Sequence, residues 1–360
     1  MTDLYQRSID IILSNQAPTG AYVACPNFPT YHYCWFRDGA FSAYAMDRVG
    51  EYTSAARFHG WAAAAINARG HVVERATARA YNREPLGKAD ILHTRYTVDG
   101  GEDTGKEEWP NFQLDGFGTW LWALREHQQL SGADLPDDWR SAARLAADYV
   151  AALWPRPCYD CWEEFSDRVH PHTLAAVYGG LRAHAELDHA DHTASLQAIQ
   201  RFLFEAAVQE GHFVKFIGSG DVDSSLLGLA VPYGVVALDD PRMRATIEQL
   251  ERELQRGGGL HRYATDTYYG GGEWVLLTAW LGWYYVQVGE HHKAEAALRW
   301  VEAQADPEGQ FPEQVPVSLN DPAYLKLWQE RWGEIANPLL WSHAKYIILR
   351  SAWQERPQIP

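Results

Sequence analysis

The loops of this chain alternate between long and short along its whole length, and this alternation restricts the fold more than any other feature. The long loops span residues 20–37, 81–111, 154–171, 257–273 and 306–337, and the other connections are short and polar. If the helices pair into a closed toroid, all of the long loops lie on one face of it. Because loops carry function more often than the elements they connect, we expect the functional site on that face.

Hydrophobic periodicity predicts about twelve helices and very few strands. The clearest helix lies between residues 239 and 257, where Asp240 can cap the first turn, Pro241 takes the first helical position and Gly257 ends the helix. Other segments with one apolar helical face are 3–14, 38–48, 52–76, 113–130, 137–153, 172–187, 192–207, 222–230, 273–288, 290–304 and 336–353. The pattern predicts an all-α fold.

The composition is that of an ordinary globular protein. Of the 360 residues, 46% are hydrophobic and 22% are charged, which excludes a disordered or low-complexity chain. No linker rich in proline, glycine or serine separates two halves of the sequence. We therefore expect a single domain over residues 1–360.

The charge and the apolar segments exclude two classes of partner. A net charge of −16 argues against a phosphate-binding surface, so we expect no nucleic acid partner. The longest apolar stretch, residues 275–288, is shorter than the roughly 20 residues needed to cross a bilayer, so we expect no membrane partner. Residues 1–10 carry acids where a secretory signal carries basic residues, which predicts a cytoplasmic protein.

The cysteines and histidines give no sign of a metal site. The four cysteines form no disulfide framework, and the Cys158-x-x-Cys161 pair lacks the second pair that a structural zinc site needs. The fifteen histidines are scattered without the spacing of metal ligands. We expect two reduced cysteines, structural roles for His32, His170 and His172, and no metal.

Two carboxylate motifs lie on long loops, at residues 161–165 and 310–314, and each places an aromatic residue beside a glutamate. Glycosidic cleavage needs two such groups. One protonated carboxyl donates to the departing oxygen, and one ionised carboxylate activates water or attacks the sugar. Glu163 and Glu313 are therefore candidate catalytic residues. Because the chain has 47 acids, spacing alone does not separate this pair from solvated surface acids.

Further loops combine aromatic rings with charged groups. Residues 31–38, 109–116 and 262–274 each place tryptophan or tyrosine beside arginine or aspartate. The rings can stack on the apolar face of a sugar, and the charged groups can hydrogen-bond its vicinal hydroxyls. Asp38 could instead cap the helix that follows it. Three glycines at 270–272 permit a tight backbone path but do not match a phosphate-binding loop.

With these motifs in this order, the chain resembles the glucoamylase family, family 15 of the glycoside hydrolases. The resemblance rests on residues 31–38, 109–116, 162–164, 262–271, 313–314 and 341–342. It implies an (α/α)6 barrel, which agrees with the helix count, and no metal or organic cofactor. It also implies an exo-acting, inverting α-glucosidase that releases β-glucose.

The resemblance also implies roles for particular residues. Glu163 resembles the general acid and Glu313 the general base. Arg37, Asp38 and Arg262 resemble the residues that hold the terminal glucose, and the remaining predicted binding residues are Tyr31, Trp35, Trp109, Asp115, Trp162, Glu164, Asp266 and Trp341. Glu273 stands where the resemblance predicts a neutral residue, which suggests a different linkage preference.

The absence of an added β-sandwich or starch-binding segment favours short oligosaccharides as substrates, such as isomaltose (α-1,6) or malto-oligosaccharides (α-1,4). Three alternatives stay open. The same family includes trehalases, and helical toroids also occur in catalytically silent sugar-binding regulators, although the presence of Glu163 and Glu313 argues against the latter. A terpenoid cyclase would need an Asp-rich motif, for which Asp221-Val-Asp223 is too slight.

Overall fold

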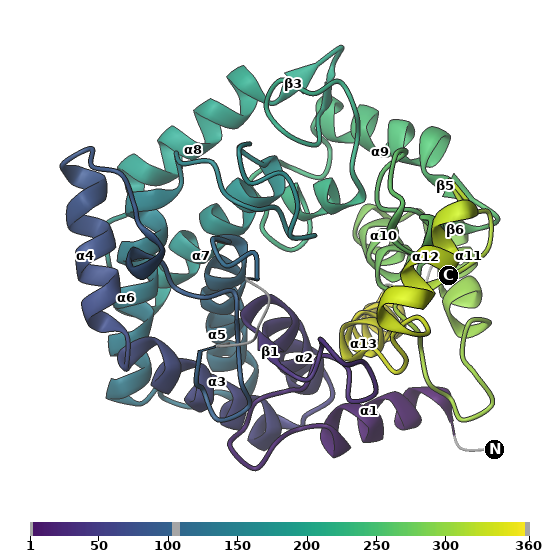
Figure 1. Cartoon of the computed structure of the whole chain (residues 1–360), viewed down its shortest axis with the longest axis horizontal. Coiled ribbons are helices and arrows are strands. Elements are labelled where there is room, and N and C mark those ends of the chain that lie inside the picture. Colours follow the sequence, from purple (N-terminus) through teal and green to yellow (C-terminus); the bar gives the residue numbers. More distant parts are fainter. Residues whose placement is uncertain (1–2, 103–108, 357–360) are drawn as a thin grey trace.

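The computed structural model describes residues 3–102 and 109–356, whose helices form two concentric rings (Figure 1). The inner ring consists of α2 (Phe36–Arg48), α5 (Asp115–Ser131), α7 (Pro171–Asp188), η2 (Ser224–Leu229), α10 (Val275–Val288) and α13 (Leu340–Glu355). Each of these helices contacts the next, and α13 contacts α2, so the ring is closed. The prediction of an all-α (α/α)6 barrel is confirmed.

The outer ring covers the inner one. It consists of α1 (Leu4–Ser14), α3 (Tyr52–Asn67), α4 (Gly70–Tyr81), α6 (Asp137–Leu153), α8 (Thr193–Ala206), α9 (Pro241–Glu253) and α11 (His291–Glu302). Outer helices bury one face, as α9 does with Met243, Ile247 and Leu250. Inner helices touch neighbours on all sides, so α10 buries every residue from Val275 to Tyr285.

Three segments differ from the sequence prediction. The predicted helix at 52–76 is two helices, because Arg69 leaves the helical conformation (φ −116°, ψ 19°) and its guanidinium donates hydrogen bonds to the carbonyls of Ala65 and Gly100. The segment 222–230 forms the 3-10 helix η2, which the Asp223 carboxylate caps. The predicted loop 306–337 contains a further helix, α12 (Ala323–Trp332), which begins after the Asp321 carboxylate accepts a hydrogen bond from the Ala323 amide.

Short strands tie the long loops together. The pairs are β1 (Cys34–Trp35) with β2 (Arg95–Tyr96) and β3 (Val208–Gln209) with β4 (His212–Phe213). A four-stranded antiparallel sheet contains β5 (Gln255–Arg256), β6 (Gly259–Leu260), β7 (Glu273–Trp274) and β8 (Gln314–Val315). In β7 and β8, Trp274 lies opposite Gln314, so the loops at 257–273 and 306–337 are held side by side. The 3-10 turns η1 (Lys88–Asp90) and η3 (Tyr268–Gly270) lie in the same set of loops.

The described helices give no candidate for a transmembrane segment, since none combines the necessary length and hydrophobicity. All four cysteines are free and buried, among them Cys158 and Cys161, which were expected to be reduced. A cytoplasmic location stays a prediction.

Candidate active site

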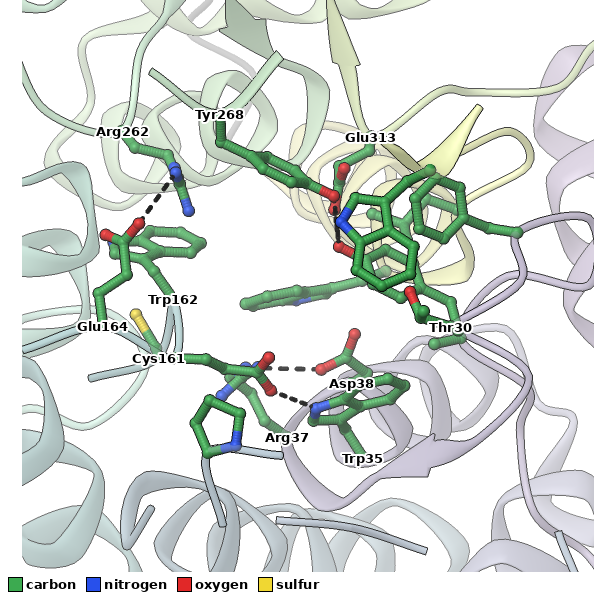
Figure 2. Close-up of a pocket in the computed structure, with 18 of the residues that line it drawn as sticks. Thr30, Trp35, Arg37, Asp38, Cys161, Trp162, Glu164, Arg262, Tyr268 and Glu313 are labelled. Carbon is green, nitrogen blue, oxygen red and sulfur yellow. Dashed lines mark hydrogen bonds and ion pairs between the residues drawn. The ribbon is translucent and has the colours of Figure 1, made fainter. Parts of the chain in front are cut away.

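One cavity of about 360 Å³ opens among the long loops, as their alternation predicts. All five long loops contribute to its lining, together with Trp341 at the start of α13. In Figure 2, Arg262 and Glu164 lie on one side of the pocket, Trp35 and Asp38 lie on the other, and Tyr268 lies beside Glu313. The lining residues named by the sequence analysis are Tyr31, Trp35, Arg37, Asp38, Trp109, Trp162, Glu163, Glu164, Arg262, Glu313 and Trp341.

Glu163 is held in an unusual backbone conformation. Its φ is +70°, a left-handed value that non-glycine residues adopt rarely and that clusters at functional sites. The Asp160 carboxylate accepts hydrogen bonds from the amides of Trp162 and Glu164, each 2.9 Å long, which fixes the turn on both sides of Glu163. The indole of Trp35 then donates a 2.6 Å hydrogen bond to Oε1 of Glu163. Backbone and side chain are therefore both fixed.

A buried cluster of charged residues, Lys215, Asp160 and Asp223, contacts this turn. The Lys215 ammonium lies 3.5 Å from the Asp160 carboxylate and also contacts Asp223, which accepts the indole N–H of Trp162 at 3.1 Å. Burial raises the pKa of Asp160 to about 6, against the opposing charge of Lys215. At Asp223 the charge and hydrogen bond of Lys215 outweigh burial, so that its pKa is lowered. The Lys215 ammonium thus contacts two buried carboxylates that lie beside the turn of Glu163.

Glu313 lies just before β8, and the residue is 4% exposed. The Tyr31 hydroxyl donates a 3.1 Å hydrogen bond to Oε1, whereas Oε2 has no hydrogen-bond partner within the described residues. Burial raises the pKa of Glu313 to about 8, although the charge of Arg262 and the Tyr31 hydrogen bond oppose the shift. The free oxygen is available to a ligand or a water molecule.

Arg37 and Asp38 stand in the first turn of α2, at the pocket. The Arg37 guanidinium lies over the Trp341 ring, 5.1 Å from its centroid, and donates to Asp115 and Gln113, each at 3.0 Å. The Asp38 carboxylate lies 3.4 Å from Nε of Arg37, and burial raises its pKa to about 6. The first turn of α2 therefore places both a cation and a carboxyl group at the pocket.

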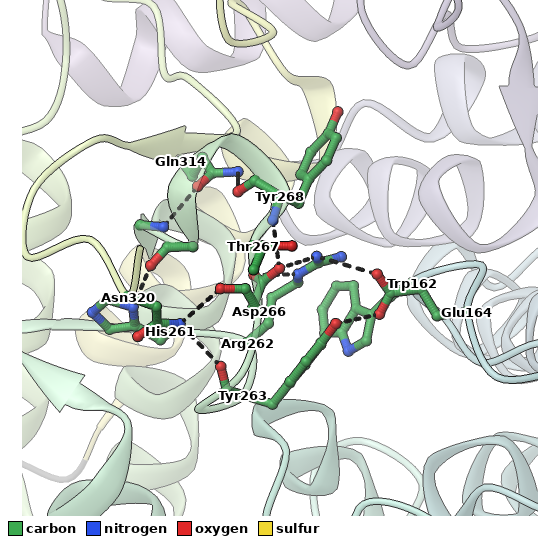
Figure 3. A network of polar contacts seen from close by, with 12 residues as sticks. Trp162, Glu164, His261, Arg262, Tyr263, Asp266, Thr267, Tyr268, Gln314 and Asn320 are labelled. Carbon is green, nitrogen blue, oxygen red and sulfur yellow. Dashed lines mark hydrogen bonds and ion pairs between the residues drawn. The ribbon is translucent and has the colours of Figure 1, made fainter. Parts of the chain in front are cut away.

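Arg262 forms a second anchor (Figure 3). Its guanidinium donates to both oxygens of Asp266 and lies 3.6 Å from the Glu164 carboxylate. Four rings surround it, those of Trp162, Tyr263, Tyr268 and Trp274, with their centroids at 5.1 to 5.5 Å from the guanidinium carbon. Opposite charge and rings on several sides leave this cation little freedom to move.

Two of the predicted binding residues, Asp115 and Asp266, are not among the residues that line the pocket. Asp115 is fully buried behind Arg37, and Asp266 is 1% exposed behind Arg262. Each carboxylate orients an arginine and neutralises its charge, so it acts on a ligand only through that arginine.

Glu273 is also placed differently from the prediction. In β7 it alternates with Trp274, which lines the pocket, and Glu273 instead faces the backbone of Gly257 and Gly259. Since side chains alternate along a strand, the Glu273 side chain points away from the pocket that Trp274 lines. Burial raises its pKa to about 7.

The histidines have the structural surroundings expected of them. The His170 ring is bonded to the carbonyls of Cys158 and Phe165, and the His172 ring to the carbonyl of Ser225. Neither these two residues nor the exposed His32 line the cavity.

One wall of the pocket was not predicted from the sequence. Helix α12 contributes Trp328, Arg331 and Trp332, and Tyr268 contacts Trp328 with ring centroids 5.0 Å apart. The sequence does contain a signal for this helix. Asp321 is followed by Pro322, just as Asp240 is followed by Pro241 at the start of α9. Tyr268 and Trp274 stand in a motif that was recognised, although neither was named as a binding residue.

The comparisons with known proteins agree with this geometry. The model of the family described as glycosyl hydrolases family 15 matches residues 1–310. The chain is 41% identical to isomaltose glucohydrolase from Kribbella flavida, over 96% of this chain and 91% of that protein. A solved glycosidase variant in complex with glucose superposes with a TM-score of 0.93 at 40% identity, covering 98% of this chain and 97% of the other.

A more distant structure supports the fold alone. A bacterial glucoamylase complexed with acarbose has a TM-score of 0.78 at 21% identity, and covers 98% of this chain but 55% of its own. Since the family match spans most of the sequence and the first relative matches over nearly its full length, the chain belongs to family 15 of the glycosyl hydrolases.

Proposed function

We propose that this glycoside hydrolase is an exo-acting, inverting α-glucosidase that releases β-glucose from the non-reducing end of short isomalto-oligosaccharides. The observation that carries the proposal is one pocket that is lined by the carboxylates of Glu163 and Glu313 and by two aromatic-stacked arginines, Arg37 and Arg262. The whole chain is proposed to act as one catalytic domain.

In this proposal Glu163 is the general acid. Its Oε1 accepts the Trp35 indole N–H, which leaves Oε2 to carry the proton that goes to the departing glycosidic oxygen. The left-handed turn and the Asp160 hydrogen bonds keep the carboxyl from rotating away. Fixed orientation of this kind is what proton donation in the transition state requires.

Glu313 is proposed as the general base. Its Oε1 is held by Tyr31, while Oε2 is free to take a proton from a water molecule. The water then attacks the anomeric carbon from the face opposite the leaving group, which inverts the configuration there. Inverting enzymes place their two carboxyl groups roughly 6.5 to 9.5 Å apart to admit that water, and we expect this separation here.

The remaining pocket residues are proposed to hold the terminal glucose. Arg37, Asp38 and Arg262 offer charged hydrogen-bonding groups to its hydroxyls, and the Trp341 ring offers a flat apolar surface. Trp328 and Trp332 of α12 lie where a leaving sugar can stack. Because the polar groups concentrate around one sugar, cleavage from the chain end is favoured over internal cleavage.

The proposed preference for α-1,6 linkages rests on the relative named isomaltose glucohydrolase. The direct test is to measure kcat/KM for glucose release from isomaltose, maltose and trehalose under the same conditions. The proposal predicts the highest value for isomaltose. A highest value for trehalose would make the enzyme a trehalase and would overturn the substrate assignment, as would a higher value for maltose.

A further inference from the structure

Three buried polar side chains meet at a place that the proposed catalytic function does not use. They are Asp47 near the end of α2, His59 in α3 and His127 in α5, and none of them lines the pocket. One potential ligand atom from each residue lies within 4.8 Å of the other two. The fold therefore brings together two imidazoles and a carboxylate from three helices.

The cluster lies toward the end of the barrel opposite the pocket. Asp38 stands in the first turn of α2 and lines the pocket, and Asp47 follows nine positions later, which at 1.5 Å per residue is roughly 14 Å along the helix. Asp115 begins α5 behind Arg37, a residue that lines the pocket, and His127 follows twelve positions later, roughly 18 Å away. A ligand held by these residues is too distant to touch a bound sugar.

The polar atoms of the cluster are incompletely satisfied. His127 Nδ1 lies 2.8 Å from Oδ1 of Asp47, in a hydrogen bond that joins two of the three residues. Oδ2 of Asp47 and both ring nitrogens of His59 have no hydrogen-bond partner within the described ranges. His59 is 0% exposed and Asp47 is 2% exposed. Buried polar atoms are nearly always hydrogen-bonded, so three buried atoms without a partner in one cluster indicate a bound species.

The surroundings do not supply the missing partners. The Trp139 ring closes the site, with its centroid 5.9 Å from that of His59 and 6.1 Å from that of His127, and Phe58 packs against His59 at 5.5 Å. Among residues 3–102 and 109–356, no lysine or arginine forms an ion pair with Asp47. A buried carboxylate without a cation is costly, so a positive ion is the species that best fits this site.

We propose that Asp47, His59 and His127 bind one Zn²⁺ ion that joins α2, α3 and α5. Imidazole nitrogen and carboxylate oxygen are ordinary zinc ligands, and a water molecule can complete a tetrahedral set. With metal–ligand distances of 2.0–2.1 Å, ligand atoms stand about 3.4 Å apart, so modest side-chain rotation closes the present spacing. The sequence gives no signal for this site, because its ligands are separated by twelve and sixty-eight positions.

The first test is the metal content of the intact chain. Protein produced in zinc-supplemented medium and then desalted is measured by inductively coupled plasma mass spectrometry, and we expect close to one zinc per chain. The variants His59→Leu and Asp47→Asn should each lose at least nine-tenths of it. His184→Gln changes another buried histidine, one that pairs with His192, and should retain the zinc.

The second test measures stability and does not depend on activity. After removal of metal with a chelator, added Zn²⁺ at about a hundred times its dissociation constant should raise Tm by about 3 °C or more, and equal Mg²⁺ should not. Asp47→Asn, which preserves side-chain shape, should show no such rise and should keep the kcat of the unaltered enzyme. Zinc below about a tenth of an equivalent with no Tm response would overturn the proposal, as would full zinc content in both variants.

Discussion

Trp35 donates its indole N–H to Oε1 of Glu163 at 2.6 Å, and these two residues lie on different long loops. The same loop that carries Trp35 also carries Tyr31, whose hydroxyl donates to Glu313, and the Tyr31 and Trp35 ring centroids are 5.6 Å apart. One aromatic pair therefore contacts both proposed catalytic carboxylates. Their relative position is fixed by packing in this loop as well as by the barrel.

The two carboxylates should have separable effects on catalysis. Glu163→Gln and Glu313→Gln should each lower kcat by on the order of 10²- to 10⁴-fold, because each removes one proton-transfer group. A glucosyl fluoride needs little protonation of its leaving group, so it should partly rescue Glu163→Gln and not Glu313→Gln. Glu273→Gln is a matched control, since that buried glutamate faces away from the pocket. Rescue of the Glu313 variant alone would exchange the two roles.

The pH dependence should respond to Tyr31. Its hydrogen bond favours the ionised form of Glu313 and so lowers the pKa of a carboxyl that burial has raised to about 8. Tyr31→Phe removes this bond, so the pKa should rise further and the acid limb of the pH profile of kcat/KM should move to higher pH. Tyr263→Phe removes a hydroxyl that donates to Glu164 and should leave that limb in place. A shift of the acid limb to lower pH in Tyr31→Phe would contradict the assignment.

The charge cluster under Glu163 should be important for stability. Lys215→Met leaves the carboxylates of Asp160 and Asp223 buried without their cation, which should lower the free energy of unfolding by about 3 to 5 kcal/mol. Lys293→Met breaks a partly exposed pair with Glu251 and should cost at most about 1 kcal/mol. Denaturant titration of both variants gives the comparison. An equal loss of unfolding free energy in both variants would mean that the buried cluster does not stabilise the turn of Glu163.

The α12 wall should affect binding of the leaving sugar. Trp328→Ala removes a ring that lines the pocket, and loss of one stacking contact of about 0.5 to 1.5 kcal/mol should lower kcat/KM for isomaltose roughly 2- to 13-fold. An aryl glucoside, which lacks the leaving sugar, should be affected less by this substitution.

The unaltered enzyme should prefer short substrates. In a series of isomalto-oligosaccharides, its kcat/KM should be highest for two or three units. A steady rise out to five or six units would indicate an extended cleft.

Much of the site could be predicted because aromatic and charged residues stand next to one another in the long loops of the sequence. The sequence does not show whether a carboxylate in a motif with arginine contacts a ligand or the arginine. Asp115 and Asp266 were therefore predicted to bind substrate. In the structure they form ion pairs with Arg37 and Arg262. The division of helix 52–76 depends on hydrogen bonds from Arg69 to a distant loop, which periodicity does not reveal. Helix α12 could have been predicted from its cap.

The stereochemistry of the first product tests the central proposal most directly. Isomaltose is mixed with enzyme in an NMR tube, and the anomeric proton signals of glucose are recorded before mutarotation equilibrates them. An inverting α-glucosidase with Glu163 as acid and Glu313 as base predicts that β-glucose forms first and α-glucose appears later. Initial release of α-glucose would show retention through a covalent intermediate and would contradict the proposed mechanism.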